Sequence, residues 1–573
     1  MLRVFYTIIT ISELKETKKG RDMKKITVAQ YLIKELNNLG IEDFFGLPGD
    51  YNFNILYAIG DNQNTNWVGC TNELNAGYAA DGYARIKGYG ALVTTFGVGE
   101  LSAINAIAGS FAENIPVIKI VGTPATKFIK EKTVLHHNFQ NPDYYAFERA
   151  FSNVVETTAF LDENNAKAEI DRILSVFIKK NRPVYVAIPE DICLLEIEDI
   201  SGLEIPKSDP DSLKLATEHC LKLINNAEYP AILGDVLVKR FKAKTEFLSF
   251  VEKSQFPVST LIMGNGIVEV DYPRFVGTFL TQFENITSLD TLKKSDCVVS
   301  VGTIICDLNT FKFSLPFQTT DFIDIQGTYT IIENRKYENV LMKDILIELK
   351  LGIEPKCLEI PKVNIGFKNV TADDNKMLSS SYIYPRFQEF LKPNDILFAE
   401  TGIIPYGVAP ARLPENVDFN TQTLWGSIGW ATPASFGAQM AAKDRRVILI
   451  TGEGSHQLTA QEISNFMKQG LNPIIIVFNN LGYTIERILS NDPFDFFNEV
   501  ISWDYSKLPQ VFEGQVWVAQ ARTEREFNDA LKQAEIEQQT KMCYIEIFTE
   551  KMDVPELTQK IVDKIKRPLP TSQ

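Results

Sequence analysis

Apolar segments rich in β-branched residues alternate with amphipathic segments along the chain, and the alternation falls into three blocks. In the first block, from Ile26 to about Ile200, we expect strands at 91–96, 117–122 and 184–188 and one helix at 100–113. Short apolar strands separated by helices are typical of a parallel sheet that is covered by helices. The first block is therefore predicted to be an α/β domain.

Two further blocks repeat this pattern. The second runs from about Leu213 to Gly352, with strands expected at 231–234, 258–262, 297–301 and 321–325. The third extends to about Leu557, with strands expected at 396–399, 447–451, 474–478 and 543–548. Segment 196–212, with two prolines among acidic residues, and the polar segment 366–381 separate the blocks. We predict three doubly wound parallel-sheet domains at 23–205, 206–365 and 366–573, preceded by an N-terminal extension at 1–22.

The composition narrows the class of partner. The chain of 573 residues has a formal net charge of −15 and no basic cluster, which excludes a general nucleic-acid binder. Its seven cysteines are scattered, without a C-x-x-C pair, and are expected to be reduced thiols of a cytoplasmic protein. Residues 4–11 superficially resemble a signal sequence but lack a small-residue cleavage site, so we expect the working chain to begin near Met23. No run of about 20 apolar residues occurs, so no membrane span is predicted.

The clearest local motif follows the expected strand at 447–451. Gly452-Glu453-Gly454-Ser455 leads into an expected helix in which Thr459 and Glu462 have the spacing of a capping box. Glycines let the backbone come close to an anion, and a helix N-terminus favours negative charge. Taken alone, the motif is weak evidence, and an ordinary tight connection between a strand and a helix explains it better.

A second motif strengthens this interpretation. The next expected strand ends at Asn479-Asn480-Leu481-Gly482. Because parallel strands end at the same edge of a sheet, Asn480 and Glu453 are expected to lie near each other. Carboxylate, amide and carbonyl oxygens are suitable ligands for a Mg²⁺ ion that bridges to phosphate. The two motifs together predict a metal and phosphate site.

With these residues the chain resembles the thiamine-diphosphate enzymes, whose fingerprint is Gly-Asp-Gly followed further along by Asn or Asn-Asn. It is most similar to the 2-keto acid decarboxylases, from about Ile26 onward. The matching segments are Phe45–Asp50, Asn72–Asn75, Ala80–Arg85, Thr95–Ser102, His136-His137, Leu424–Gly429 and Gly482–Glu486. The resemblance implies a carboxy-lyase that uses thiamine diphosphate and Mg²⁺ to convert a small 2-keto acid to an aldehyde and carbon dioxide. It also implies a homodimer or homotetramer.

The resemblance further implies roles for individual residues. Glu73 would hydrogen-bond the aminopyrimidine ring and make the cofactor's own amino group the base. The residues that orient the substrate and relay protons would be Asp50, His136, His137 and Glu486. Cofactor contacts are implied at Glu73, Thr401, Gly426, Ile428, Gly454, Ser455, Thr484 and Ile485, and metal ligands at Glu453, Asn480 and Gly482.

Each of these residue types also has an ordinary structural explanation. Glu73 is an acid at an expected helix N-terminus, Asp50 is a common turn residue, and Ile428 is suited to core packing. His136-His137 suits an exposed loop, and the sequence shows no third metal ligand near this pair. It is the combination of these residues with the metal motif that favours the catalytic interpretation.

Departures from the family pattern leave alternatives open. Glu453 stands where the family has Asp, and its extra methylene displaces the carboxylate by about 1.5 Å. We expect metal binding to persist because Ser455, Asn480 and Gly482 are retained. Pro405 stands where relatives often have bulky aromatic residues, which suggests a pocket that is not narrowed solely for pyruvate. The alternative functions are an acetolactate-synthase-like carboligase and a cofactor-binding scaffold without activity.

Overall fold

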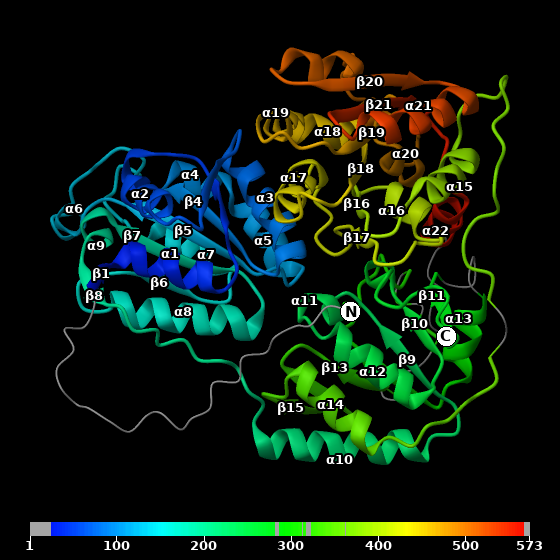
Figure 1. Cartoon of the computed structure of the whole chain (residues 1–573), viewed down its shortest axis with the longest axis horizontal. Helices are drawn as coiled ribbons and strands as arrows, with labels where there is room; N and C mark the ends of the chain where they lie inside the picture. Colours follow the sequence, from blue (N-terminus) through cyan, green and yellow to red (C-terminus); the bar gives the residue numbers. More distant parts are fainter. Residues whose placement is uncertain are drawn as a thin grey trace.

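The computed structural model describes residues 25–280, 286–311, 313, 315–316, 322–360 and 363–566. They form three α/β units, each built on its own sheet: a first unit in blue and cyan, a middle unit in green, and a third unit in yellow to red (Figure 1). The predicted α/β class with three mostly parallel sheets is confirmed. The domain limits given above stay a prediction, and the extension at 1–22 lies outside the described residues.

The first unit contains a parallel six-stranded sheet in the order β3-β2-β4-β5-β7-β6. A short antiparallel pair, β1 with β8, lies beside it. The strands are β1 (Lys25–Thr27), β2 (Asp43–Gly46), β3 (Asn66–Gly69), β4 (Gly90–Thr95), β5 (Val117–Thr123), β6 (Thr158–Phe160), β7 (Val184–Pro189) and β8 (Glu196–Glu198). The α-helices are α1 (Val28–Asn38), α2 (Phe53–Asp61), α3 (Glu73–Lys87), α4 (Val98–Ser102), α5 (Ile104–Ala112), α6 (Thr126–Lys130), α7 (Ala146–Phe151), α8 (Ala166–Lys180) and α9 (Glu190–Cys193).

One helix of the first unit differs from the prediction. The single helix expected at 100–113 is divided into α4 and α5 at Ala103. The Ala103 N–H donates to the Glu100 carbonyl, three residues back, at 3.1 Å. Such a bond tightens the turn into 3₁₀ geometry and changes the direction of the chain.

The middle unit contains a seven-stranded sheet in the order β11-β10-β9-β12-β13-β14-β15. Strand β14 is antiparallel to both of its neighbours, β13 and β15, so this sheet is mixed, whereas a fully parallel one was predicted. The strands are β9 (Pro230–Gly234), β10 (Val258–Thr260), β11 (Phe275–Thr278), β12 (Cys297–Val301), β13 (Phe322–Ile325), β14 (Tyr329–Ile332) and β15 (Arg335–Glu338). The α-helices are α10 (Pro210–Asn226), α11 (Leu237–Arg240), α12 (Lys244–Ser254), α13 (Ile286–Lys294) and α14 (Met342–Gly352).

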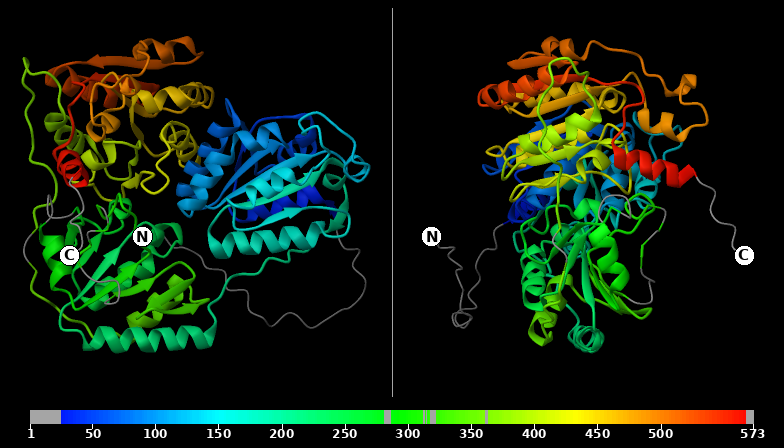
Figure 2. Two further views of the ribbon diagram at one scale, coloured as in Figure 1. Left: turned by 180° about the vertical axis from the view of Figure 1, so that it is seen from behind. Right: turned by 90° about the vertical axis from the view of Figure 1, so that its right-hand side faces the viewer.

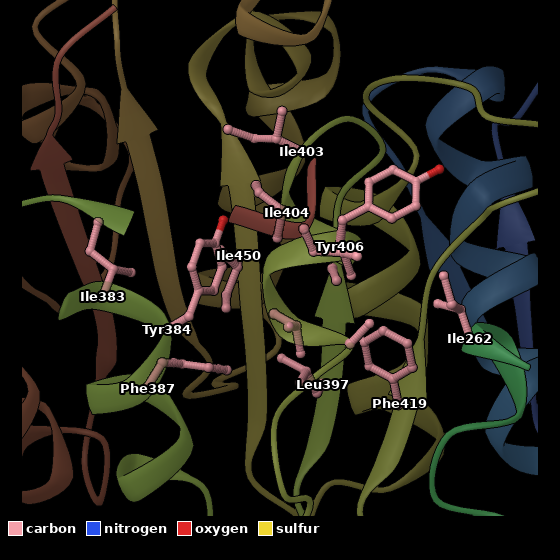
Figure 3. Close-up of a cluster of buried hydrophobic side chains, with 14 of the residues drawn as sticks. Ile262, Ile383, Tyr384, Phe387, Leu397, Ile403, Ile404, Tyr406, Phe419 and Ile450 are labelled. Carbon is pink, nitrogen blue, oxygen red and sulfur yellow. The ribbon is translucent and has the colours of Figure 1, made fainter. Parts of the chain in front are cut away.

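The third unit has a parallel six-stranded sheet in the order β17-β16-β18-β19-β21-β20. The strands are β16 (Ile396–Ala399), β17 (Asp418–Asn420), β18 (Val447–Gly452), β19 (Ile474–Asn479), β20 (Val516–Ala521) and β21 (Met542–Phe548). The α-helices are α15 (Ser380–Phe390), α16 (Ile404–Val408), α17 (Ala431–Ala441), α18 (Glu453–Thr459), α19 (Ile463–Lys468), α20 (Thr484–Leu489), α21 (Glu524–Glu537) and α22 (Glu556–Lys566). Its apolar core includes Leu397, Ile404, Tyr406 and Ile450, and Ile262 of the middle unit joins the same cluster (Figure 3).

The first and third units meet where α3 lies along α17 (Figures 1 and 2). A Cβ on Gly82 would come within 1.8 Å of the Ala434 carbonyl oxygen, and a Cβ on Gly437 would come equally close to that of Ala79. Glycine is therefore required at both points of the crossing. Small residues were expected to let another element or a cofactor approach α3, and the structure shows that the element is α17.

In the described part of the chain, each helix is too short or too polar to cross a bilayer.

Candidate active site

A cavity of about 370 Å³ opens at the carboxyl ends of strands β16, β18 and β19. This is the sheet edge where open α/β folds bind ligands. Its described lining residues all lie between 401 and 486, so the third unit alone forms it. The predicted residues that line it are Thr401, Ile428, Glu453, Gly454, Ser455, Asn480, Gly482, Thr484, Ile485 and Glu486. The two motifs chosen from the sequence therefore meet at one site.

Glu453 connects the two loops of this cavity. It is the first residue of α18 and only 2 % exposed. Its Oε1 accepts the backbone N–H of Asn480 at 3.1 Å and that of Gly482 at 2.8 Å. Burial raises the pKa of Glu453 to about 7, although these N–H groups and the Arg487 guanidinium act in the opposite direction.

The capping box predicted at Thr459 and Glu462 is wrong. Strand β18 passes directly into α18 at Gly452, so Thr459 ends this helix instead of beginning one. The Thr459 hydroxyl donates to the Gly429 carbonyl at 2.7 Å. Glu462 reaches the first unit, where its Oε2 accepts the Thr71 hydroxyl at 2.6 Å and the Asn75 amide at 3.0 Å. These bonds fix the start of α3, the helix whose first residue is Glu73.

A second cluster lies in the first unit and contains Asp50, His136 and His137. The His136 Nε2 is 2.9 Å from the Asp50 Oδ2, and the two imidazole rings have centroids 4.4 Å apart. The expectation that the histidine pair has no third metal-ligating residue nearby is wrong, because the ligand atoms of all three residues lie within 4.8 Å of one another. Residues far apart in sequence meet here because Asp50 and the histidine loop both follow parallel strands.

Tyr51 belongs to this cluster but was not predicted. Its hydroxyl is 3.1 Å from the His136 Nδ1, so the two ring nitrogens of His136 contact Tyr51 and Asp50. Burial raises the pKa of Tyr51 to about 12, so the hydroxyl stays protonated. The only available signal was its position next to Asp50 in the Phe45–Asp50 segment.

Glu73 lies at the partly exposed N-terminus of α3, beside a buried polar group that the sequence analysis also missed. Lys119, on strand β5, is fully buried, donates to the Thr94 hydroxyl, and faces Glu100 and Glu73. Burial lowers the pKa of Lys119 to about 7 and raises that of Glu100 to about 7. A lysine in the middle of the apolar strand 117–122 was the signal that could have revealed it.

Three family models match the chain, one within each unit. They are the thiamine pyrophosphate enzyme N-terminal TPP binding domain at 26–147, the central domain at 217–345 and the C-terminal TPP binding domain at 407–547. Pyruvate decarboxylase from Kluyveromyces lactis is 35% identical over 547 residues, which cover 93% of this chain and 97% of that protein. Pyruvate decarboxylase isozyme 1 of Saccharomyces cerevisiae is 34% identical over 95% of this chain and 98% of its own length. The chain belongs to the pyruvate decarboxylase family. The predicted family is confirmed.

Membership of the pyruvate decarboxylase family implies thiamine diphosphate with a divalent metal such as Mg²⁺, as predicted. The residues present fit the metal. The Asn480 Oδ1 is buried and has no hydrogen-bond partner within the described part of the chain. An unpaired buried acceptor costs about 1–3 kcal/mol, and a hard cation would satisfy it. Both hydrogen bonds of Glu453 end on Oε1, so its Oε2 is not used by either.

The predicted site residues thus fall into two groups. The third-unit cavity gathers the predicted metal and diphosphate residues together with Glu486, and Gly426 lines a neighbouring cavity. Glu73, Asp50, His136 and His137 line neither cavity within the single chain.

Proposed function

We propose that this protein is a thiamine-diphosphate-dependent carboxy-lyase that converts a 2-keto acid to an aldehyde and carbon dioxide. The observation that carries the proposal is the single cavity that joins the Glu453–Asn480 loops to Glu486. This cavity would place the Glu486 carboxylate, which is suited to acid–base chemistry, next to the loops that hold the cofactor. The full-length similarity to proteins named pyruvate decarboxylases favours this reaction over ligation of two keto acids.

The residues of this chain would divide the work as follows. Glu453, Asn480 and the Gly482 carbonyl would hold the metal, and Gly454 and Ser455 would contact the diphosphate. When bound, thiamine diphosphate supplies the electron sink for the bond that breaks. Glu73 would hold the aminopyrimidine ring in its reactive protonation state. The acids and imidazoles (Asp50, His136, His137 and Glu486) would orient the substrate and move the proton to the product carbon as one coupled group.

The proposal includes a homodimer as the smallest active form, in which the first unit of one chain covers the third-unit cavity of its partner. The Asp50 and His136 side chains are 50% and 55% exposed in the single chain, which is unusual for a catalytic pair. Large apolar side chains beside both groups are also exposed: Phe53 and Val98 in the first unit, and Leu458 and Leu481 in the third. Exposed apolar groups next to polar functional residues are typical of a surface that another chain covers.

The test is release of carbon dioxide and aldehyde from pyruvate, a branched-chain keto acid, phenylpyruvate and indolepyruvate, with and without thiamine diphosphate and Mg²⁺. We expect aldehyde only when both are present. Acetolactate as the main product would instead indicate a carboligase, and the lack of any cofactor-dependent thermal shift would indicate a scaffold.

Glu73→Gln tests the division of roles. The variant should fold and dimerise normally but lose most of its turnover, whereas near-normal activity would contradict the role of Glu73. Glu42→Gln is the matched control, because Glu42 is an exposed acid of the same unit that pairs with Lys87.

A further inference from the structure

A second cavity, of about 230 Å³, adjoins the first. The two share Thr401, Gly402, Ile485 and Glu486, so Glu486 lies where they meet. Carbon atoms form most of the wall of the second cavity. Its apolar lining includes Ile262, Pro405, Tyr406, Leu489, Ile561 and Val562.

The wall of the second cavity is assembled from separate parts of the chain, so tertiary packing holds it in place. Pro405 and Tyr406 come from α16, Leu489 from the end of α20, and Ile561 and Val562 from α22. Helix α22, in red, lies near the middle unit, which contributes Ile262 (Figures 1 and 2). Tyr406, Ile561 and Val562 are at most 8% exposed, so the wall is held by the core shown in Figure 3.

We infer that the second cavity receives the substrate's side chain and that the preferred substrate is a 2-keto acid with a branched aliphatic side chain rather than pyruvate. The inference rests on the proposed function. Glu486 and Thr401 mark the junction, so a keto acid bound there would extend its side chain away from the metal loop and into the second cavity.

The cavity is too large to be filled by a substrate whose side chain is only a methyl group. An apolar cavity of about 150 Å³ in another protein is large enough to hold benzene. The second cavity is larger, so the methyl group of pyruvate would leave most of the wall without contacts. Each additional methylene that a hydrophobic pocket can hold changes kcat/KM by about 10- to 200-fold. A branched alkyl group would contact much more of this mostly apolar wall than a methyl group can.

The first experiment compares kcat/KM of the holoenzyme for 4-methyl-2-oxopentanoate, pyruvate and phenylpyruvate. We expect the branched acid to exceed pyruvate by about tenfold or more. Equal or better use of pyruvate, or a preference for phenylpyruvate, would overturn the inference and leave the decarboxylase proposal intact. If none of the acids is decarboxylated, the proposed function itself fails.

Val562→Phe tests the cavity directly, because it fills the space at a residue outside the metal and cofactor loops. The ratio of kcat/KM for the branched acid to that for pyruvate should fall by about tenfold. Calorimetric titration with the unreactive 4-methylpentanoate, compared with propanoate, should show the same loss of preference without turnover. Ile536→Phe, at a residue that is 65% exposed on α21, is the control and should leave both ratios unchanged.

Leu489→Phe provides a second route if Val562→Phe fails to fold, because Leu489 is 39% exposed and tolerates a larger side chain more easily. A folded variant of either kind with unchanged ratios would show that the side chain does not enter this cavity.

Discussion

The substitution Glu453→Asp separates two tasks that a single carboxylate performs in this chain. Glu453 Oε1 binds two backbone N–H groups at 3.1 and 2.8 Å, and the same side chain is the proposed metal ligand. Shortening it by one methylene withdraws the carboxylate by about 1.5 Å, which is beyond hydrogen-bond reach of both N–H groups unless the turn follows. The metal-free protein should therefore become less stable while the metal site is retained.

The magnitude follows from the two hydrogen bonds. Above the Glu453 pKa of about 7, where the carboxylate is charged, hydrogen bonds to it contribute about 1.5–3 kcal/mol each, and partial movement of the turn would recover some of this. We expect the free energy of unfolding of the metal-free protein to fall by about 2–4 kcal/mol, measured by urea denaturation in the presence of a chelator. Mg²⁺ affinity, measured by calorimetry with thiamine diphosphate present, should stay equal or rise, because the shorter carboxylate matches the geometry of the family's site.

Glu453→Gln is the matched control, because it keeps the length of the side chain and removes its charge. Its amide oxygen can still accept both N–H groups, but the charge that attracts the metal is gone, so Mg²⁺ affinity should fall by at least about a hundredfold, which corresponds to 2.7 kcal/mol. The reasoning is refuted if Glu453→Asp loses more than about tenfold in Mg²⁺ affinity, or if its metal-free stability stays within about 0.5 kcal/mol of the parent.

Three further predictions follow from the described contacts. Glu400 directly follows strand β16 and is fully buried, and this burial raises its pKa to about 7. Its contribution to the free energy of unfolding is therefore present below pH 4.5 and is lost as the pH rises through 7 and the carboxyl ionises. Glu400→Gln cannot ionise, so its free energy of unfolding in urea denaturation should fall by about 3 kcal/mol less than the parent's between these pH values. Gly82→Ala should destabilise the protein by about 1–3 kcal/mol because its Cβ collides with the Ala434 backbone. Gly60→Ala should be neutral or stabilising, because among the described residues its added Cβ would meet nothing within 4 Å beyond its own stretch of helix. Tyr51→Phe removes one contact of the His136 ring and should lower kcat about 2- to 12-fold. The concentration of thiamine diphosphate that gives half-maximal activity should change little. An unchanged kcat would show that Tyr51 does not position the His136 ring.

The sequence predicted best what depends on local pattern. Strands β18 and β19 are short apolar segments that end in glycine or asparagine. Because parallel strands end at one edge of the sheet, the sequence alone predicts that Glu453 and Asn480 meet. The hydrogen bonds from the Asn480 and Gly482 backbone to Glu453 could not be foreseen, since they depend on a side-chain conformation. The division of helix 100–113 at Ala103 was equally hidden, because no proline or glycine marks it.

The capping-box prediction failed because the partner of Glu462 lies in another unit. The spacing of Thr459 and Glu462 has a local explanation, the capping box, that any helix can use, yet Glu462 bonds to Thr71 and Asn75 nearly 400 residues earlier in the chain. Local spacing cannot distinguish a side chain that caps its own helix from one that bridges two units, because both need only a carboxylate near a helix end. A buried bridge of this kind has a consequence for catalysis. It ties the position of α3, and so of Glu73, to the third unit of the same chain. In the proposed dimer, a change at Glu462 should therefore alter how Glu73 meets the partner chain's cavity, without Glu462 contacting the cofactor.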